Sequence, residues 1–594
     1  MTATLDLWPI GNCQVSALID RAGRFVWGCV PRVDGEPLFS ALIGGDAPGQ
    51  GYWAIDLEDA VAIEQQYRRN SAVLVTRQQD AQGNAIEVID FAPRFRRMGR
   101  QYRPVAFARI VRPLSGAPRI RVRLRPSRGD GARAPQRIGG THHVRYQLAA
   151  MTLRLSTTAP VGLIEAEQPF RVESTLHFFL GPDESFVGEI GATLEAMLAD
   201  TERDWREWVR GLATPLDWQP AVIRAAITLK LCQHEETGAI VAALTSSIPE
   251  HADSGRNWDY RFCWIRDAYY TVQALNRLGA LDVLEGYLAY LRNIVDAAKG
   301  GQIQPLYGVL GEARLEERTA AGFPGYRGMG PVRFGNQAYE QVQHDAYGQI
   351  VLSNTQAFFD QRLFRLSGEA DFAALEQIGE RAFALFDQPD AGLWELRTRR
   401  HVHTYSAAMC WAACDRLAKA ASALGLRARA DFWQHRADAL RARVEAAAWR
   451  PDTNRLSATF EGDDLDASLI QLLDLRFLAP DDPRFLGTLA AVEAGLRRGS
   501  HMLRYASEDD FGLPQTAFNV CTFWLIEALH FTGRTGEARA LFEEMLARRT
   551  SAGLLSEDID PVSGELWGNY PQTYSLVGII NCAVLLSRPW SAIR

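Results

Sequence analysis

The stretch GATLEAMLADTERDWREWVRGL, residues 191–212, marks a change in the hydrophobic period of the chain. Leu194, Met197, Leu198, Trp205 and Val209 recur at the spacing of one helix face, and most of the remaining positions are acidic or basic. This pattern predicts an amphipathic helix. Because the segments on its two sides have different periods, we interpret residues 191–216 as a helical linker between two domains.

The residues before the linker have the pattern of short antiparallel strands. In RIRVRLR, residues 119–125, apolar and cationic residues alternate, as expected for a strand with one buried and one exposed face. Asp20–Gly23 and Asp80–Asn84 have turn composition and join strand-like runs at hairpin distance. Residues 1–190 are therefore predicted to form an antiparallel β-sandwich domain.

The residues after the linker, 217–594, contain about twelve segments with a helical period. These segments begin near Ala221, Ile265, Ala280, Asp345, Asp371, Thr404, Arg427, Leu465, Pro483, Thr516, Gly536 and Thr573. Alternating short turns and long loops predict helical hairpins that close into a ring. The long loops at 300–342, 393–403 and 553–571 are rich in glycine, aromatic and charged residues, so we expect a pocket where they share one rim.

The overall composition disfavours several classes of partner. The chain has 594 residues, of which 23% are charged, and its formal net charge of −7 is spread along it. Nucleic-acid binding requires a concentrated basic surface, and the nearest basic cluster, Arg94–Arg100, is interpreted as a solvated loop. No stretch approaches the roughly 20 apolar residues that span a bilayer. Residues 1–18 lack the features of a secretory signal, so we expect no membrane partner and a cytoplasmic location.

The eight cysteines fit that expectation. Six of them lie in apolar, helix-like surroundings, where a reduced thiol packs as a small hydrophobic group. Cys410 and Cys414 share a helix face, but no His or Cys cluster completes a metal site around them. The sequence therefore predicts neither a metal nor another cofactor.

Residues 256–268, RNWDYRFCWIRDA, combine four aromatic residues, three arginines and two aspartates immediately before a helix. One interpretation is a buried ion-pair network, in which Asp267 caps the helix or favours its dipole. The other is sugar recognition, because aromatic faces stack on a pyranose while fixed arginine and aspartate side chains bind its hydroxyl groups. We favour sugar recognition.

Two loops carry candidate catalytic carboxyl groups. Glu395 lies between Trp394 and Arg397, and a structural pair of Glu395 with Arg397 is the alternative to catalysis. Burial against an indole would raise the pKa of Glu395, whereas a nearby guanidinium would lower it. Glu557, in LLSEDID, residues 554–560, could instead belong to a solvated acidic loop or a calcium-like turn. Together, the two glutamates are typical of a glycosidase pair.

The chain resembles bacterial members of glycoside hydrolase family 15, which includes glucoamylases, glucodextranases and trehalases. The resemblance covers nearly the whole chain and rests on the motifs Ile10–Asn12, Trp27–Arg32, Thr237–Ala242, Arg256–Arg261, Trp264–Asp267, Gly330–Asn336 and Gly568–Gln572. It implies an N-terminal β-sandwich followed by an (α/α)6 barrel. Val33 and Gly35 stand where relatives often carry Phe and Ser, and Leu576 stands where many carry His. These departures concern substrate preference and not the reaction.

The resemblance also implies roles for individual residues. Glu395 would be the general acid and Glu557 the general base of an inverting reaction that leaves room for a water molecule between base and sugar. The remaining substrate-binding residues would be Arg266 and Asp267 around the non-reducing glucose, Trp258 and Trp394 as aromatic walls, Arg397 beside them, and Tyr326, Arg333 and Asn336 in the outer loop.

The expected function is an exo-acting α-glucoside hydrolase that releases β-glucose from trehalose or short α-glucans. Trehalose is slightly favoured, because the chain shows no recognisable starch-binding appendage or secretion signal. Two alternatives remain: an inverting phosphorylase of a related helical-barrel family, and a catalytically inactive sugar-binding protein. The expected partner is a small α-glucoside or oligosaccharide, and the outer surface of a barrel of this size is compatible with a homodimer.

Overall fold

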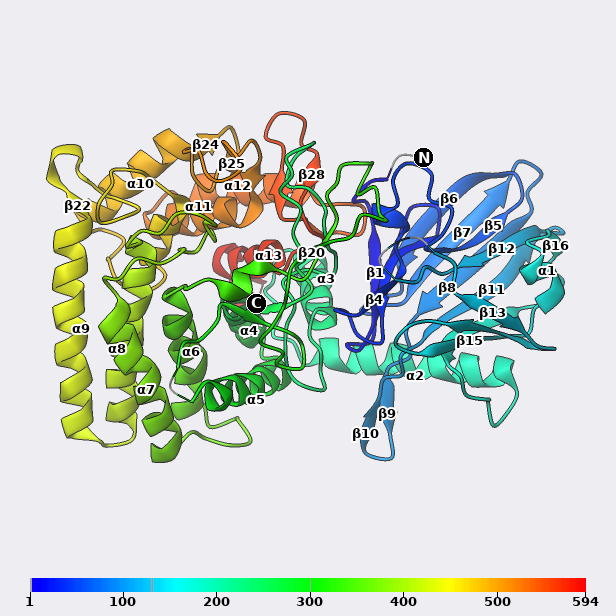
Figure 1. The fold of residues 1–594 in the computed structure, drawn as a ribbon, viewed down its shortest axis with the longest axis horizontal. Helices are drawn as coiled ribbons and strands as arrows, with labels where there is room; N and C mark the ends of the chain where they lie inside the picture. Colours follow the sequence, from blue (N-terminus) through cyan, green and yellow to red (C-terminus); the bar gives the residue numbers. More distant parts are fainter. Residues whose placement is uncertain (1–2, 130, 132, 300, 594) are drawn as a thin grey trace.

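The chain folds into an N-terminal pair of β-sheets and a C-terminal ring of helices, joined by one long helix (Figure 1). A computed structural model describes residues 3–129, 131, 133–299 and 301–593. The predicted succession of a β-sandwich and a helical barrel is confirmed. The arrangement places the long barrel loops on the side where they can meet the sandwich.

The β-sandwich consists of one seven-stranded and one eight-stranded antiparallel sheet. The first sheet contains β1 (Trp8–Gly11), β2 (Ser16–Ile19), β3 (Phe25–Val30), β4 (Glu36–Phe39), β5 (Tyr52–Leu57), β12 (Arg119–Arg125) and β16 (Phe170–Arg171). The second contains, in order, β13 (Gln136–Gly139), β14 (His143–Gln147), β15 (Thr152–Thr157), β17 (Leu176–Pro182), β11 (Phe107–Ser115), β8 (Ala85–Phe91), β7 (Leu74–Asp80) and β6 (Ala60–Tyr67). In β12 the apolar residues are buried and alternate with more exposed arginines, as the sequence predicted.

Aromatic residues and one buried ion pair fill the space between the two sheets. Phe25, Trp53 and Phe107 are almost fully buried and contact one another through Phe25. Among them lies the fully buried guanidinium of Arg109, whose Nε donates to Asp90 Oδ1 at 2.7 Å and whose other nitrogens reach backbone carbonyls. A buried charge is tolerated here because its hydrogen-bonding groups have partners.

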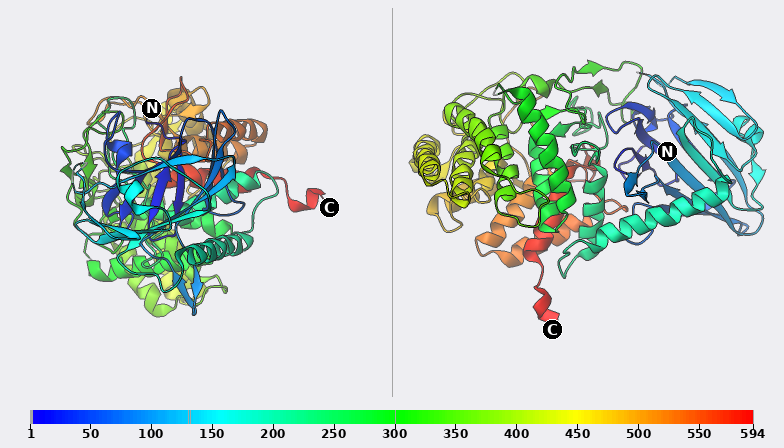
Figure 2. Two further views of the ribbon diagram at one scale, coloured as in Figure 1. Left: turned by 90° about the vertical axis from the view of Figure 1, so that its right-hand side faces the viewer. Right: turned by 90° about the horizontal axis from the view of Figure 1, so that it is seen from below.

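Helix α2 (Ile190–Arg210) follows the sandwich and confirms the helix predicted over residues 191–212. Leu194 and Leu198 pack on the outer face of the eight-stranded sheet. Trp205 and Val209 pack with residues of both domains, including Cys13 and Ile227. Figure 2 shows α2 extending from the sandwich toward the barrel. We propose that the domain limits fall around it, at residues 1–190, 191–216 and 217–594.

The helical domain is a closed ring of six inner and six outer elements among the described residues. The outer elements are α3 (Gln219–Leu231), α5 (Leu281–Ala298), α7 (Glu369–Leu385), α9 (Arg427–Ala448), α10 (Pro483–Leu496) and α12 (Thr535–Ala547). The inner elements are α4 (Ile265–Arg277), α6 (Asp345–Thr355), α8 (Thr404–Ala423), the 3-10 helix η5 (Ala467–Leu472), α11 (Asn519–Phe531) and α13 (Thr573–Leu586). Each inner element packs against the next, and α13 closes the ring on α4.

The minor elements are short. They are α1 (Val161–Glu165), the hairpin of β9 (Phe95–Arg97) and β10 (Arg100–Tyr102), the two-residue strands β18 (Cys263–Trp264), β19 (Leu306–Tyr307), β20 (Arg318–Thr319), β21 (Arg333–Phe334), β22 (Trp449–Arg450), β23 (Arg455–Leu456), β24 (Arg497–Arg498), β25 (His501–Met502), β26 (Ala517–Phe518), β27 (Asp558–Ile559) and β28 (Leu566–Trp567), and the 3-10 helices η1 (Ala41–Ile43), η2 (Gln337–Glu340), η3 (Gln356–Phe358), η4 (Pro451–Thr453) and η6 (Trp590–Ile593).

The sandwich directly supports the loops at the rim of the barrel. The indole Nε1 of Trp27 donates to the carbonyl of Leu244 at 2.6 Å, and Arg261 Nη1 donates to the carbonyl of Gly35 at 2.8 Å. Both donors are buried. Because Arg261 belongs to the segment 256–268, the sandwich helps to hold the segment that the sequence marked as chemically rich.

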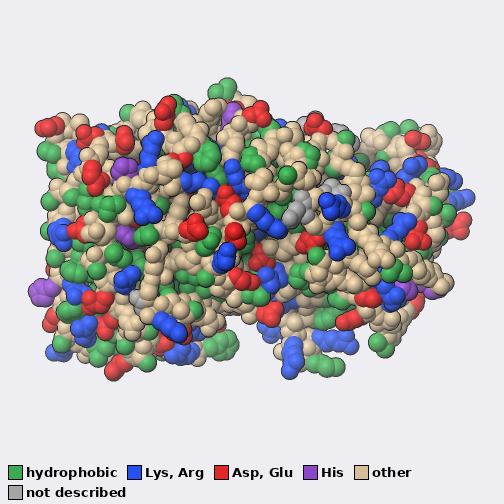
Figure 3. Space-filling view, viewed as in Figure 1, with side chains coloured by type: hydrophobic (Ala, Val, Ile, Leu, Met, Phe, Trp, Pro, Cys, Tyr) green, Lys and Arg blue, Asp and Glu red, His purple; other side chains and the backbone are tan. Residues whose placement is uncertain are grey.

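The cysteines agree with the expectation of reduced thiols that pack as small hydrophobic groups. On the face shown in Figure 3, acidic and basic side chains are interspersed. Within the described residues, every helix is too short or too polar to cross a bilayer. All eight cysteines are buried and none forms a disulfide.

Candidate active site

A pocket opens at the N-terminal ends of the inner helices, where the long loops converge. Six residues of the segment 256–268 line it: Arg256, Trp258, Tyr260, Trp264, Arg266 and Asp267. The same segment also contains a structural ion pair, because Arg261 Nη2 lies 2.7 Å from Asp259 Oδ2 and both side chains are buried. The ion-pair interpretation therefore holds for Asp259 and Arg261, and sugar recognition by the residues that line the pocket stays a prediction.

Arg266 and Asp267 are placed by the first turn of α4. Arg266 Nη1 donates to the carbonyl of Leu393 at 3.0 Å, and its Nη2 lies 3.3 Å from Asp267 Oδ2. Burial raises the pKa of Asp267 to about 6, although the charge of Arg266 acts in the opposite direction. Apart from its ion pair with Arg266, the buried Oδ2 of Asp267 has no hydrogen-bond partner among the described residues.

Glu395 reaches the pocket from the loop before α8. Its backbone has a φ of 59°, in the left-handed region that few residues other than glycine adopt. Its Oε1 accepts hydrogen bonds from Trp264 Nε1 at 2.6 Å and from Arg266 Nη2 at 3.1 Å. The side chain keeps 22% of its surface exposed, so these contacts leave part of the carboxyl group open to the pocket.

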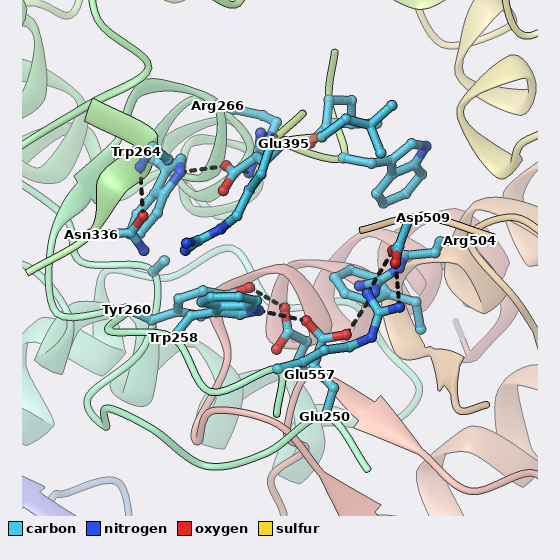
Figure 4. Close-up of a pocket in the computed structure, with 18 of the residues that line it drawn as sticks. Glu250, Trp258, Tyr260, Trp264, Arg266, Asn336, Glu395, Arg504, Asp509 and Glu557 are labelled. Carbon is cyan, nitrogen blue, oxygen red and sulfur yellow. Dashed lines mark hydrogen bonds and ion pairs between the residues drawn. The ribbon is translucent and has the colours of Figure 1, made fainter. Parts of the chain in front are cut away.

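Glu557 lies on the opposite side of the pocket, immediately before β27 (Figure 4). Its Oε1 accepts a hydrogen bond from the hydroxyl of Tyr260 at 2.6 Å, and its Oε2 has no hydrogen-bond partner among the described residues. Burial raises the pKa of Glu557 well above the usual range for a glutamate, and the neighbouring carboxyl groups of Asp558 and Glu250 add to that rise.

A network of buried charges beside Glu557 was not predicted from the sequence. Glu250 accepts hydrogen bonds from Trp258 Nε1 at 3.0 Å and from Arg504 Nη2 at 2.6 Å. Arg504 and Glu250 both line the pocket, together with the buried pair of Arg256 and Asp509. The mixture of aromatic and charged residues in RYASEDDF, residues 504–511, is the signal that could have identified this loop.

The two tryptophans expected as aromatic walls both line the pocket, and each is held by a carboxyl group. Glu250 holds Trp258, and Asp466 Oδ2 accepts from Trp394 Nε1 at 3.1 Å. The guanidinium carbon of Arg397 lies 4.1 Å from the centroid of the Trp258 ring. Arg397 forms an ion pair with Glu317 at 2.8 Å, so the alternative of a structural pair with Glu395 is wrong.

The three residues expected in the outer loop lie at different places relative to the pocket. Asn336 lines the pocket. Arg333 lies behind the wall, since its Nη1 donates to the carbonyls of residues 255 and 257 and its guanidinium approaches the Trp258 ring. Tyr326 is outside the described pocket lining, because its hydroxyl donates to the carbonyl of Ala3 at 3.2 Å and its ring contacts Trp567. Tyr326 and Arg333 are therefore not among the residues that line the described pocket, whereas Asn336 is.

The acidic residues around Glu557 do not form a cation site. Among the described residues, groups of three or more His, Cys, Asp or Glu side chains with a geometry that could hold a metal ion are absent. The carboxyl groups of Glu250 and Asp509 are instead engaged by Arg504 and Arg256. The calcium-like turn that the sequence left open at residues 554–560 is therefore not formed.

Comparison with known proteins agrees with this architecture. The model of glycosyl hydrolases family 15 matches residues 219–584, and the model of the trehalase-like N-terminal domain matches residues 7–158. The chain belongs to glycosyl hydrolases family 15. The family inferred from the sequence motifs is thereby confirmed, and the protein is a glycoside hydrolase.

Relatives of this family 15 hydrolase match it over nearly the full length. A trehalase of Thermoplasma volcanium is 30% identical, with 97% of this chain and 92% of that protein covered. A trehalase of Mycobacterium tuberculosis is also 30% identical, with 98% and 89% covered. The crystal structure of a bacterial glucoamylase complexed with acarbose superposes with a TM-score of 0.68 at 13% identity, over 98% of this chain and 94% of that one. The last likeness concerns the fold alone.

Proposed function

We propose that this hydrolase cleaves α-glucosides with inversion and releases β-glucose from the non-reducing end, with trehalose as the preferred substrate over short α-glucans. The observation that carries the proposal is the placement of Glu395 and Glu557 on opposite sides of one pocket (Figure 4). The preference for trehalose is supported by the trehalases that match the chain over nearly their full length.

In this mechanism, Glu395 donates a proton to the glycosidic oxygen and Glu557 removes a proton from the attacking water. Arg266 donates a hydrogen bond to Glu395 and forms an ion pair with Asp267, so it links the proposed acid to the proposed sugar-binding carboxyl group. Tyr260 donates to Oε1 of Glu557, so the buried Oε2, which has no hydrogen-bond partner among the described residues, is the oxygen proposed to take the proton. Tyr260 thus orients the base.

Substitution of the base tests the proposal most directly. Glu557→Gln should lower kcat by about 10²–10⁴-fold, the usual contribution of general acid–base catalysis, while glucose binding and the melting temperature stay close to wild type. Glu565→Gln is the matched control, because it changes an exposed carboxyl group of the same hairpin. A Glu557→Gln enzyme with normal turnover contradicts the assignment.

The acid is tested by comparing leaving groups. Glu395→Gln should slow trehalose hydrolysis strongly but affect α-glucosyl fluoride much less, because fluoride leaves without a proton from the enzyme. Equal losses on both substrates would exclude the acid role for Glu395. Proton NMR at the start of the reaction should show β-glucose from α-glucosyl fluoride, whereas trehalose should give equal amounts of β-glucose from the attacked unit and α-glucose from the leaving unit.

The substrate and the two alternative functions are separated by one set of assays. Trehalose, maltose, isomaltose and maltotriose are incubated with the enzyme in parallel, with and without phosphate. Glucose release from trehalose above the others supports the proposal, whereas glucose 1-phosphate identifies a phosphorylase. A protein that binds these sugars without cleaving them would be the inactive sugar-binding alternative. The cytoplasmic location and the homodimer stay predictions from the sequence.

A further inference from the structure

A second cavity lies at the end of the barrel opposite the active site. It is lined by residues near the C-terminal ends of α4 and α11 and by residues 471–480, and it has a volume of about 730 Å³. The active-site pocket lies at the other ends of these two helices, where Arg266, Asp267 and Phe518 line it. Hereafter this cavity, which includes Tyr270, Trp524, Glu527 and Asn581, is called the basal pocket.

The short inner element η5 explains why this end of the barrel is open. Its six residues at about 2.0 Å per residue span about 12 Å, whereas the 13 residues of α4 or α11 at about 1.5 Å per residue span about 20 Å. Beyond Leu472 the chain continues as turns and not as a helix, so η5 does not extend the inner wall to this end of the barrel. Space therefore remains between α4, α11 and α13.

Aromatic rings form the deep end of the basal pocket. Tyr270, Trp524 and Tyr574 line it, and each keeps less than a tenth of its surface exposed. Tyr270 and Tyr574 contact each other edge to face with ring centroids 5.4 Å apart. Aromatic faces of this kind suit the C–H face of a sugar or polyol ring.

Polar groups interrupt the apolar stripes of the two helices that flank the pocket. Glu527 is the single acidic residue of α11, and Asn581 is the single amide of α13. Both line the pocket, and Asn581 Oδ1 has no hydrogen-bond partner among the described residues. Burial, together with Asp474, raises the pKa of Glu527 to about 8, so near neutral pH its carboxyl group can donate as well as accept a hydrogen bond.

The charges at the mouth of the basal pocket have opposite signs. Arg277, Arg476 and Asp474 line it and are exposed, and Arg441 in the same lining is paired with Glu445. Because charges of both signs stand at the rim, the ligand class follows from the groups inside. Rings, a carboxyl group and amides, Gln273 and Gln471 included, match a neutral molecule with several hydroxyl groups.

We propose that the basal pocket is a second binding site for a small neutral polyhydroxy compound, such as a monosaccharide or a sugar alcohol. The site shares a wall with the active site, because Tyr574 lines both pockets. The guanidinium of Arg266 lies 5.8 Å from the Tyr574 ring, and Trp524 contacts both Tyr574 and Trp394. A bound polyol would therefore contact Tyr574 and Trp524, the rings that separate the basal pocket from the active site.

Equilibrium dialysis with radiolabelled glucose tests this proposal on the full-length chain. The wild-type protein should bind two glucose molecules per chain at concentrations that saturate the catalytic pocket. Glu527→Leu should bind one, because it removes the hydrogen-bonding group of the basal pocket. Asp267→Asn, which impairs the catalytic sugar site, should also bind one, and the double variant should bind none.

The four proteins separate failure of this site from failure of the proposed function. One molecule in the wild type and none in Asp267→Asn would overturn the basal site and leave the catalytic assignment intact. Two molecules in both proteins would instead mean that Asp267 does not bind sugar. Glu543→Leu, on the outer helix α12, is the control for an added leucine, and Asn581→Ala replaces Glu527→Leu if the latter does not fold. Binding of tetramethylammonium in place of glucose would overturn the ligand class.

Discussion

Glu557 has two buried carboxyl neighbours, and this environment sets when it can act as a base. Asp558 and Glu250 favour its protonated form, whereas the hydrogen bond from Tyr260 and the charge of Arg504 favour the ionised form. A base works only when it is deprotonated, so the acid side of the kcat/KM profile should follow the pKa of Glu557. Because that pKa is raised, we expect activity to fall as the solution is acidified, beginning at a pH above the usual pKa of a glutamate.

Glu250→Gln is the sharpest test at the residue scale. Removing this negative charge lowers the pKa of Glu557, because the neighbouring charge raises it and because Arg504 loses its ion-pair partner. The acid limb of the kcat/KM profile should therefore move to lower pH. Glu340→Gln, at an exposed glutamate outside the pocket lining, should leave the limb in place. An unchanged acid limb in Glu250→Gln would show that Glu250 has only a structural role.

At the scale of elements, Glu557 is positioned by the short hairpin of β27 and β28, which lies next to the inner helices α11 and α13. Glu557 precedes β27, whose partner β28 is followed by Gly568. Gly568 has a φ of +74°, and a Cβ atom there would lie 2.7 Å from Glu557 Cβ and 2.8 Å from its Oε2. The absence of a side chain at position 568 therefore leaves room for the side chain of Glu557.

Gly568→Ala should lower kcat while the protein stays folded, because the new methyl group displaces Glu557. The matched control is Gly564→Ala in the same hairpin. Gly564 has a φ of +75°, but its Cβ would meet only the mobile end of Arg548. Both variants should lose about 1–2 kcal/mol of stability from the left-handed backbone, measurable by thermal unfolding. Equal kcat values for the two variants would show that Glu557 does not need the space left by Gly568.

At the scale of the whole molecule, buried carboxyl groups make stability depend on pH. Asp390 is fully buried beside the loop that carries Glu395, and burial raises its pKa to about 8. Its Oδ2 accepts from the backbone of His344 and from Ser406, each at 2.8 Å. Between about pH 4 and this value, the folded protein keeps a proton that the unfolded chain has released, so the free energy of unfolding falls as pH rises.

Asp390→Asn should remove that part of the pH dependence, because an amide does not titrate in this range. The melting temperature of the variant should fall less between pH 5 and pH 8 than that of the wild type. Differential scanning calorimetry across this range measures the difference. The exposed Asp452 offers the control Asp452→Asn, which should reproduce the wild-type slope. If the melting temperature of Asp390→Asn fell with pH as steeply as that of the wild type, the raised pKa of Asp390 would be contradicted.

The sequence by itself determined the two-domain order, the linker helix and the helical ring. Alternation in Arg119–Arg125 and the stripe from Leu194 to Val209 depend on residues close in the chain, so the period alone predicts them. The resemblance in the motifs also identified Glu395, Glu557, Arg266 and other residues that the structure places in one pocket.

Only the tertiary structure decided which side chains meet across long separations. Glu250 and Arg504 are 254 residues apart in the chain, and local patterns carry no information about such a pair. The same holds for Arg397, which pairs with Glu317, and for Tyr326, which faces the N-terminal segment. The basal pocket likewise exists because a six-residue inner element faces longer helices across the barrel, and such a mismatch in length appears only when the ring is closed.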